Sequence, residues 1–486
     1  MPIMSLSGSE RDFLTLLGEV VFGNPFSAKR AEVVTRLAPD VPLGDVTAHR
    51  EALAHAVASR FARILEEPRI LQRLGEETRH LLEPALLYVC YHRYLPQLDA
   101  LIAQQANGGA PSPVSFAGEA IGTLVQGGID EQRAVQFFAG FFQLRRAFYF
   151  ILGSLAGECE SMRRLREALW NNVFTHDMRS YMDGLWNRME DFSTLLLGET
   201  GTGKGQAAAA IGRSAYIPYL PGERCFAANF AETFISINLS QYPETLIESA
   251  LFGHRKGAFT GASDHHRGVF ERCSTNGALF LDELGEVSIP VQVKLLQVLQ
   301  ERTFTPLGGS EKKRFSGRVI AATNRNLADL QAEGRFREDF FYRLCSDVIE
   351  VPSLRQRVSE SPRELELLVA QLVERIAGTR NTDGVLTALA RDLPAGYSWP
   401  GNVRELEQAV RRVLLTGRYL PPPAQARNDD DILVARLRGG ELSAAELVAG
   451  YSRMLYRRLG TYADVAKRTG LDPRTSRKHI EGEGSG

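Results

Sequence analysis

The sequence of 486 residues contains few cysteines, and they are not grouped. The five cysteines are scattered along the chain without a Cys-x-x-Cys pair (Cys90, Cys159, Cys225, Cys273 and Cys345). A disulfide framework or a zinc site needs paired or closely spaced cysteines, so this pattern argues against both. Reduced thiols are typical of the cytoplasm, and we expect the protein to be located there.

The sequence also shows no signal-peptide pattern, no long apolar run and no excess of charge. No N-terminal segment has the pattern of a secretory signal. The best apolar stretch, Ala147 to Gly157, is about half as long as a membrane helix needs to be, so we expect no membrane partner. The net charge is -1, with 44% apolar and 24% charged residues. This is an ordinary globular balance, and any nucleic-acid surface must therefore be local.

The length suggests about three domains of roughly 150 residues each. Residues 1–168 are predicted to form a mostly α-helical regulatory or sensory domain, since apolar residues recur there at spacings of three and four. Residues 104–113 have the composition of an internal loop. An aromatic cluster at helical spacing fits the core of a helical bundle, and it also fits a ligand pocket or a dimer interface (Phe137, Phe138, Phe141, Phe142, Phe148, Tyr149 and Phe150). The acidic cluster of a phospho-receiver domain is absent from this part of the sequence.

The segment from Leu195 to Gly205 has the pattern of a phosphate-binding loop. Its three leucines predict the end of a buried strand, and the alanine-rich run at 206–211 predicts the helix that follows. In this context backbone N–H groups and the helix dipole hold phosphates, and Lys204 reaches the β and γ oxygens. A glycine-rich turn with a chance lysine is the alternative. The nucleotide-binding candidates form one run: Gly198, Glu199, Thr200, Gly201, Thr202, Gly203, Lys204 and Gly205.

Two further predicted strands end in polar side chains that suit ATP hydrolysis. Residues 277–281 form an apolar run that is followed by Asp282 and Glu283. Asp282 suits the water shell of Mg²⁺, and Glu283 suits the orientation and deprotonation of an attacking water. Residues 318–323 predict another buried strand, after which Asn324 is placed to sense the γ-phosphate or to hold the water.

Three arginines further along are candidates for contact with the nucleotide. Arg337 and Arg343 lie near a predicted helix, where they fit either surface salt bridges or arginine fingers. An arginine finger that contacts a neighbouring subunit's ATP raises the rate of hydrolysis by a factor on the order of 10³–10⁵. Asn402 is predicted to cap a later helix, with Glu405 completing a capping box. Arg404 would then lie in the first turn, where the helix dipole disfavours a cation, so a phosphate is its expected partner.

The segment at residues 248–262 makes the resemblance to a family specific. It contains the sequence Gly257, Ala258, Phe259, Thr260, Gly261 and Ala262. Its composition predicts a small, mobile tip with one exposed aromatic ring, which suits contact with a partner better than it suits stability. Together with the order of the motifs above, this GAFTGA loop resembles the AAA+ domain of bacterial enhancer-binding proteins, the activators of sigma-54 RNA polymerase.

The resemblance implies an α/β AAA+ P-loop ATPase over residues 169–420, with a helical lid at about 355–420. It implies ATP and Mg²⁺ as cofactors, and sigma-54 RNA polymerase holoenzyme and double-stranded DNA enhancer sites as partners. The assembly would be a hexameric or heptameric ring, dimeric when inactive, in a bacterial cytoplasm and associated with the nucleoid.

The resemblance also implies roles for individual residues. Phe259 and Thr260 would engage sigma-54, and Asn238 would couple Glu283 to the GAFTGA loop. The family's two trans-acting arginines and its second sensor match, in that order, Arg337, Arg343 and Arg404. One departure is Gly205, where most phosphate loops carry Ser or Thr and this family usually carries Glu. A second departure is the connection at residues 216–233, which is longer than is usual in the family.

The C-terminal part has the signals of a linker and a small all-α DNA-binding domain. Residues 421–442 are rich in proline and aspartate and are assigned as the linker. Ser443 and Glu446 predict a capping box that opens a helix. Residues 443–486 are assigned as a Fis-like helix-turn-helix DNA-binding domain. Within it, residues 461–480 predict helix, turn and helix, with five Lys or Arg against two Asp or Glu. The DNA-contact candidates are Arg474, Thr475, Arg477 and Lys478. A basic helical hairpin that does not bind DNA is the alternative, since Ser476 occupies a position that is usually apolar.

Taken together, the segments predict a multidomain, sigma-54-dependent transcriptional activator. Its N-terminal helices would sense a signal, its ring would hydrolyse ATP, and its GAFTGA loop would remodel the closed promoter complex. One alternative is an AAA+ remodeller of another partner, which the intact GAFTGA loop disfavours. The other is a DNA-bound repressor with a nucleotide switch, which the combination of Glu283 with the arginine pair disfavours.

Overall fold

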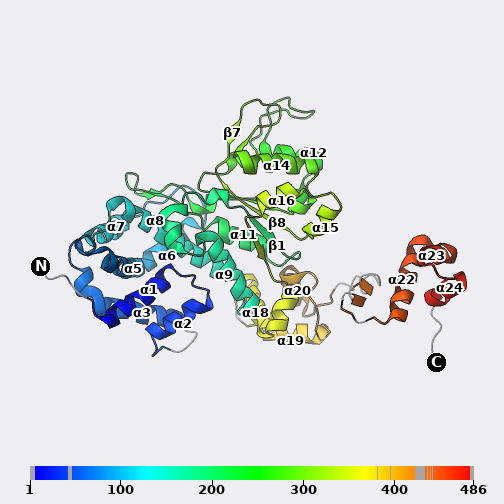
Figure 1. The fold of residues 1–486 in the computed structure, drawn as a ribbon, viewed down its shortest axis with the longest axis horizontal. Coiled ribbons are helices and arrows are strands. Elements are labelled where there is room, and N and C mark those ends of the chain that lie inside the picture. Colours follow the sequence, from blue (N-terminus) through cyan, green and yellow to red (C-terminus); the bar gives the residue numbers. More distant parts are fainter. Residues whose placement is uncertain are drawn as a thin grey trace. The chain divides into compact units, whose positions relative to one another are not determined.

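A computed structural model describes residues 6–41, 46–379, 381–394, 396–421, 433–434, 436–437, 439–440 and 442–481 (Figure 1). The chain divides into two compact units. The first comprises Met1–Thr382 with Gly396–Val410, and the second comprises Asp383–Ala395 with Arg411–Gly486. The predicted linker at 421–442 lies largely outside the described residues.

The N-terminal part of the first unit is helical, as the sequence predicts (Figure 1). Its helices are α1 (Gly8–Phe22), α2 (Ala28–Leu37), α3 (Val46–Leu65), α4 (Ile70–Arg73), α5 (Glu76–Arg93), α6 (Leu95–Gln105), α7 (Ala117–Gln126), α8 (Glu131–Gly153) and α9 (Glu160–Phe174). The aromatic cluster belongs to α8, where Phe138 and Phe142 are fully buried while Tyr149 is half exposed. Packing inside the helical part therefore accounts for Phe138 and Phe142. Among the described residues, no helix combines the length and apolar character that crossing a membrane requires.

A parallel sheet of five strands follows, in the order β4-β5-β8-β1-β9. Its strands are β1 (Thr194–Leu197), β4 (Phe234–Asn238), β5 (Ala278–Asp282), β8 (Arg318–Thr323) and β9 (Asp347–Glu350). The central strands β1, β5 and β8 are short apolar runs buried among the flanking helices, as parallel strands usually are. Since the strands are parallel, their carboxyl ends share one edge of the sheet, and the polar residues after β1, β5 and β8 gather there.

Short helices surround this sheet and lead into the lid (Figure 1). They are α11 (Lys204–Gly212), α12 (Glu244–Phe252), α13 (Val269–Arg272), α14 (Ile289–Glu301), α15 (Leu327–Ala332) and α16 (Glu338–Leu344). The lid helices are α17 (Leu354–Glu360), α18 (Arg363–Ala377), α19 (Asp383–Asp392) and α20 (Asn402–Thr416). The pair β6 (Thr303–Phe304) and β7 (Lys313–Arg314) forms a small antiparallel hairpin.

The long connection at residues 216–233 forms a hairpin of β2 (Tyr219–Leu220) and β3 (Cys225–Phe226). The ring of Phe226 stacks on that of Phe142 in α8, with centroids 4.3 Å apart. The backbone N–H of Val114, in the loop before α7, donates to the carbonyl of Arg224 at 2.8 Å. This insertion therefore holds the N-terminal helices against the nucleotide-binding fold.

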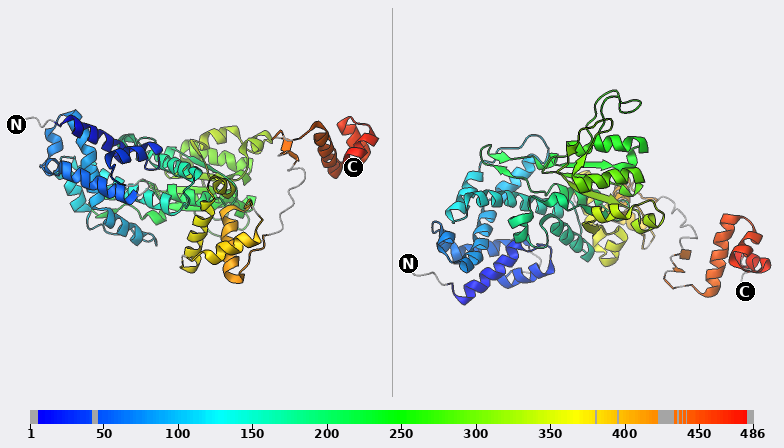
Figure 2. Two further views of the ribbon diagram at one scale, coloured as in Figure 1. Left: turned by 90° about the horizontal axis from the view of Figure 1, so that it is seen from below. Right: turned by 45° about the horizontal axis from the view of Figure 1, so that its top comes forward.

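The second unit ends in three helices, α22 (Ala444–Leu459), α23 (Tyr462–Thr469) and α24 (Pro473–Glu481), which Figure 2 shows from two further sides. The predicted capping box is present, because Ser443 accepts from the backbone N–H of Glu446 and Glu446 accepts from that of Ser443. Gly470 ends α23 in the left-handed region at φ 71° and turns the chain into α24. A short turn after Gly470 thus joins the second of these helices to the third.

Candidate nucleotide site and partner loop

The predicted phosphate loop joins β1 to the N-terminus of α11. Gly198, Gly201 and Gly203 all have positive φ (155°, 82° and 104°), which lets the backbone turn around an anion. Gly201 is also required sterically, because a Cβ there would overlap the carbonyl oxygen of Gly401. The Lys204 ammonium donates to the carbonyls of Gly198 (2.7 Å) and Glu199 (3.0 Å), and burial lowers its pKa. A phosphate would replace these carbonyls as the partner of the buried cation.

The side chain of Thr202 stabilises the shape of the loop, whereas position 205 carries no side chain. The Thr202 hydroxyl is buried and donates to the carbonyl of Glu199 at 2.9 Å. Gly205 is the second residue of α11, and a Cβ at that position would lie 3.9 Å from the ring of Phe280, at ordinary contact distance. Packing therefore does not explain why this chain lacks a side chain at position 205.

The lid contacts the loop through a residue whose role the sequence did not predict. Asn402 is fully buried, and its amide nitrogen donates to the Glu199 carboxylate and the Thr200 carbonyl, both at 3.1 Å. Its oxygen accepts from the N–H of Leu354 at 2.8 Å. The predicted capping box is therefore wrong: Glu405 does reach back, but its carboxylate accepts from the N–H of Gly401 and the hydroxyl of Tyr397. Asn402 joins the lid to the phosphate loop.

Two other side chains complete this junction. Arg355 of α17 forms an ion pair with Glu199. Arg404 is exposed at the start of α20, and its backbone N–H donates to the carbonyl of Gly201 at 3.3 Å. The side chain of Arg404 is thus placed beside the loop, as a phosphate contact requires.

The two predicted catalytic carboxylates follow β5, next to the phosphate loop. The N–H of Glu283 donates to the carboxylate of Asp282 at 3.0 Å, and Glu283 has a left-handed backbone at φ 55°. Burial, and after it the charge of Asp282, raises the pKa of Glu283. One oxygen of the Glu283 carboxylate is buried without a hydrogen-bond partner. A carboxylate with a raised pKa and an unused acceptor suits a general base for water.

The predicted polar sensors lie at the same edge of the sheet. The amide of Asn324, directly after β8, donates to the hydroxyl of Thr200 at 2.8 Å. Asn238, at the end of β4, pairs in register with Asp282 of β5. The side-chain oxygen of Asn238 accepts from the N–H of Ser240 at 3.0 Å and from its hydroxyl at 2.7 Å. The structure thus brings Asn324 to the loop and Asn238 beside the acidic strand end.

The two candidate finger arginines belong to α16, where Arg337 is the N-cap residue and Arg343 lies in the last turn, and both have local partners in the single chain. Arg337 pairs with Asp339 at 2.7 Å, and its side chain is 41% exposed. The guanidinium of Arg343 donates to the carbonyl of Leu299 at 2.9 and 3.1 Å, and this residue is also exposed. Weak exposed contacts of this kind leave both arginines available to another subunit.

The GAFTGA loop has a defined backbone conformation. The N–H of Gly257 donates to the carbonyl of Ala262 at 2.8 Å, which closes the loop, and Gly257 and Gly261 both have positive φ. The expectation of an exposed aromatic ring is wrong for Phe259. Its ring is half buried and packs edge-on against His254, with centroids 4.9 Å apart. Thr260 is exposed at the tip, Ala258 is half buried and Ala262 is buried.

In the second unit, the four candidate DNA-contact residues of α24 are exposed (Arg474, Thr475, Arg477 and Lys478). Arg477 pairs with Glu481 at 2.8 Å. Ser476 is fully buried, and its hydroxyl lacks a hydrogen-bond partner among the described residues. The polar residue at this usually apolar position is thus accommodated inside the three-helix unit.

Comparison with known proteins agrees with the geometry of the site. Residues 176–350 match the family described as Sigma-54 interaction domain, and residues 359–419 match the AAA+ ATPase lid domain. The nitrogen fixation protein VnfA of Azotobacter vinelandii is 41% identical over 242 residues, which is 48% of this chain and 43% of that protein.

Two relatives come from Escherichia coli (strain K12). The transcriptional regulatory protein ZraR is 39% identical over 284 residues, 55% of this chain and 60% of ZraR. The DNA-binding transcriptional activator HyfR is 33% identical over 370 residues, 70% of this chain and 52% of HyfR. The chain thus spans about half the length of the curated relatives it matches. Through its sigma-54 interaction domain and AAA+ lid, the chain belongs to the family of sigma-54-dependent enhancer-binding activators.

Proposed function

We propose that this protein is a transcriptional activator that hydrolyses ATP to remodel the closed promoter complex of sigma-54 RNA polymerase. The observation that carries the proposal is the presence, in one domain, of a phosphate loop, a carboxylate pair and an ordered GAFTGA loop. The first two suit hydrolysis. The GAFTGA loop presents Thr260 at an exposed tip, and the side chain of Thr260 has no role in phosphate chemistry.

The residues have distinct tasks in the proposed reaction. Lys204 and the loop N–H groups bind the phosphates of ATP, and Arg404 contacts them from the lid. Glu283 accepts a proton from the attacking water, and Asn324 helps to orient that water. Arg337 and Arg343 of a neighbouring subunit stabilise the charge that develops on the transferred phosphoryl group.

A magnesium ion fits the residues at this site. Mg²⁺ keeps several waters and is usually held by one or two carboxylates together with substrate phosphates. Asp282, at the end of β5, provides a carboxylate next to the phosphate loop. A dedicated cage of three or more ligating side chains is missing from the described residues, which agrees with this mode of binding. Bound there, the ion would neutralise charge on the β- and γ-phosphates.

The proposed assembly is a ring, hexameric or heptameric when active and dimeric when inactive. It would be carried to double-stranded enhancer DNA by α23 and α24, in a bacterial cytoplasm. The finger arginines need a neighbour, because within one chain they contact Asp339 and the carbonyl of Leu299. A ring would supply that neighbour at every site.

The test is a sigma-54 pull-down with the full chain, with and without ADP and a phosphate transition-state analogue, combined with a phosphate-release assay. We expect hydrolysis that depends on Glu283, and sigma-54 capture only with the analogue. Hydrolysis without any capture of sigma-54 would favour a remodeller of another partner. Absence of hydrolysis in the assembled protein would favour the nucleotide-switched repressor.

A further inference from the structure

A cavity of about 540 Å³ lies within the N-terminal helices, away from the nucleotide site. Helices α1, α2, α3, α5, α8 and α9 supply most of its wall. Most of the wall is apolar and much of it is aromatic, including Tyr88, Phe137, Phe141, Phe148 and Trp170. Its volume falls within the range of small-molecule pockets, and an apolar lining with a few polar groups is what such pockets have.

The polar groups of the wall favour a negatively charged ligand. Arg145 lines the cavity and is already neutralised, since its guanidinium makes two hydrogen bonds to Asp99 (2.5 and 2.8 Å). Arg30 differs, because its guanidinium donates to a backbone carbonyl, that of Val20, at 3.1 Å. Among the described residues, no carboxylate pairs with Arg30, and burial lowers the pKa of its guanidinium. A half-buried cation in an apolar wall, with no carboxylate partner among the described residues, is stabilised by an anion.

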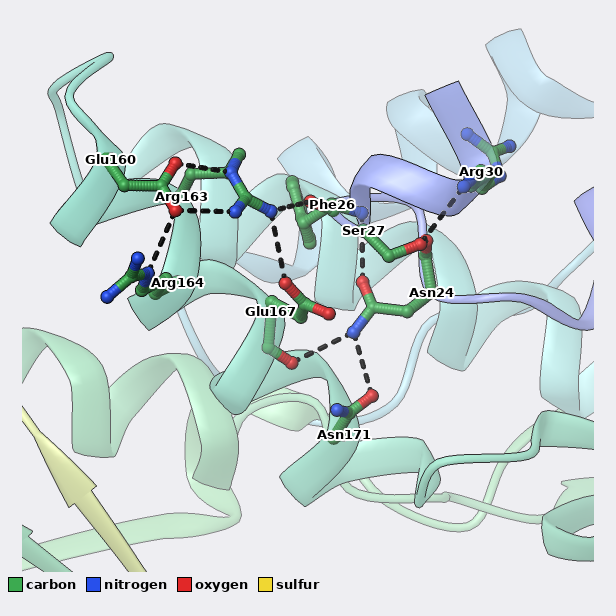
Figure 3. A network of polar contacts seen from close by, with 9 residues as sticks. All are labelled: Asn24, Phe26, Ser27, Arg30, Glu160, Arg163, Arg164, Glu167 and Asn171. Carbon is green, nitrogen blue, oxygen red and sulfur yellow. Dashed lines mark hydrogen bonds and ion pairs between the residues drawn. The ribbon is translucent and has the colours of Figure 1, made fainter. Parts of the chain in front are cut away.

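The wall is held in place before any ligand arrives. The connection between α1 and α2 is attached to α9, as Figure 3 shows. The amide of Asn24 donates to the Asn171 side chain at 2.8 Å and to the carbonyl of Glu167 at 2.9 Å. Phe26 of the same connection packs against Trp170, with ring centroids 5.9 Å apart. A preformed wall lowers the entropic cost of binding.

One helix of the wall also contacts the phosphate-loop helix. On a second face of α8, Arg146 donates to the carbonyls of Arg213 (2.6 Å) and Ala215 (2.7 Å), just beyond the end of α11. Gln143 donates to the carbonyl of Ser214 at 3.0 Å. Both side chains are fully buried, and a cation at the C-terminal end of a helix is electrostatically favourable. A shift of α8 therefore moves the far end of the helix that begins at Lys204.

We propose that this cavity binds an organic anion with an apolar, ring-sized body, whose charged group pairs with Arg30, and that its occupancy changes ATP turnover through α8. The binding part of this proposal, that the cavity takes up an organic anion, depends only on the cavity and its lining. The coupling part rests on the proposed ATPase function. The N-terminal helices would thus be the sensor of the protein, and the sensed signal would be a small molecule.

The binding part is tested by calorimetry on the full chain with two matched probes, 1-naphthoate and the neutral 1-naphthalenemethanol. We expect saturable binding that is tighter for the anion. Arg30→Gln should weaken naphthoate binding by about tenfold and leave the alcohol nearly unchanged, since one charged hydrogen bond is lost. Arg30→Lys, which keeps the charge, should restore most of the affinity. Ala31→Trp, which places a ring at the exposed rim of the wall, should weaken both probes.

Arg164→Gln is the matched control, because Arg164 is an exposed arginine of α9 that pairs with Glu160 (Figure 3). It should bind both probes like the unmodified protein. The binding part is overturned if naphthoate does not bind, if it binds no better than the alcohol, or if Arg30→Gln and Arg164→Gln behave alike.

The coupling part is tested by phosphate release with and without saturating naphthoate. We expect the rate to change severalfold in the unmodified protein and to stay constant in Arg146→Lys, which keeps a cation but not the two-carbonyl contact. Arg146→Lys should still bind naphthoate. If naphthoate does not change the rate of phosphate release in the unmodified protein, the coupling is overturned. A protein that binds naphthoate but does not hydrolyse ATP would contradict the proposed function and would still support the ligand site.

Discussion

The side-chain amide of Asn402 donates a hydrogen bond of 3.1 Å to the backbone carbonyl of Thr200, and thereby connects the lid to the phosphate loop. The same side chain accepts from the N–H of Leu354, so it joins three segments that are far apart in the sequence. Because Arg404 follows two residues later on the same helix, this contact also sets where Arg404 lies.

Asn402→Ala should weaken nucleotide binding as well as stability. It leaves the buried N–H of Leu354 without an acceptor, at a cost of roughly 1–3 kcal/mol, and releases the loop from the lid. We expect a lower unfolding temperature and a severalfold weaker affinity for ADP, measured by thermal unfolding and calorimetry. Asn326→Ala is the control, since Asn326 is an ordinary N-cap that accepts from the N–H of Ala328. It should cost about 1 kcal/mol of stability and leave ADP affinity unchanged.

Asn402 also shows which contacts could not be predicted from the sequence. The loop at 198–205, the carboxylates Asp282 and Glu283 and the amide of Asn324 lie at strand ends, where the sequence predicts them, because each is a local pattern attached to a buried strand. Asn402 was predicted to cap its own helix, since the sequence cannot show that a loop two hundred residues earlier, at Thr200, supplies its partners. Local context alone favoured the shorter-range bond.

The same distinction explains two other outcomes. The flanking glycines predict an exposed Phe259, but the ring of His254, five residues earlier in the sequence, packs against the ring of Phe259. The insertion at 216–233 had no explanation in the sequence, because its function lies in packing against α8. The stacking of Phe226 on Phe142 joins two segments whose separate patterns contain no sign of each other.

The pH dependence of hydrolysis should report the environment of Glu283. A general base must be deprotonated, and the pKa of this carboxyl is raised above its usual value of 4.5. The value of kcat/KM for MgATP should therefore fall on acidification, with a midpoint above 4.5, and be regained as the pH rises. Binding of a non-hydrolysable nucleotide over the same range separates binding from chemistry. An acid limb at or below 4.5 would contradict the assignment.

Arg337 and Arg343 should act across a subunit boundary. Mixing Arg343→Ala subunits with Glu283→Ala subunits should restore part of the hydrolysis, because some interfaces then combine an intact base with an intact arginine. Phosphate release measured over a series of mixing ratios tests this. Arg335→Ala is the matched control, since Arg335 lies next to the pair and contacts Glu333 at 3.2 Å; it should retain hydrolysis by itself. If every mixture stays at or below its parents while rings form, the trans assignment is wrong.

The C-terminal helices should supply DNA recognition and little else. Removal of residues 440–486 should abolish specific binding to enhancer DNA and leave ATP hydrolysis at high protein concentration. Arg474→Ala should weaken binding, and if Arg474 contacts a phosphate, the salt dependence should decrease by about one unit of slope. Ser476→Ala is a control in the same helix, because it removes only a buried hydroxyl without a partner. Unchanged DNA affinity in the truncated protein would refute the assignment.

A substitution at Thr260 should separate ATP hydrolysis from transcriptional activation. Its side chain is exposed at the tip of a loop that the Gly257 to Ala262 hydrogen bond closes, and the site that holds Lys204 and Glu283 does not need it. Thr260→Ala should therefore bind and hydrolyse ATP within a fewfold of the unmodified protein. It should not capture sigma-54 in the presence of a transition-state analogue, and it should not open a sigma-54 promoter in a transcription assay.

Glu283→Ala should show the complementary defect, with ATP bound but not hydrolysed, and Ser263→Ala is the matched control for Thr260→Ala. Ser263 is also an exposed hydroxyl residue, but it lies just outside the closed loop, where its hydroxyl donates to Asp264 at 3.0 Å. It should activate transcription normally. Because the loop is the feature that distinguishes this AAA+ domain from a general remodeller, full activation by Thr260→Ala would remove the reason for assigning sigma-54 as the partner, even with hydrolysis intact.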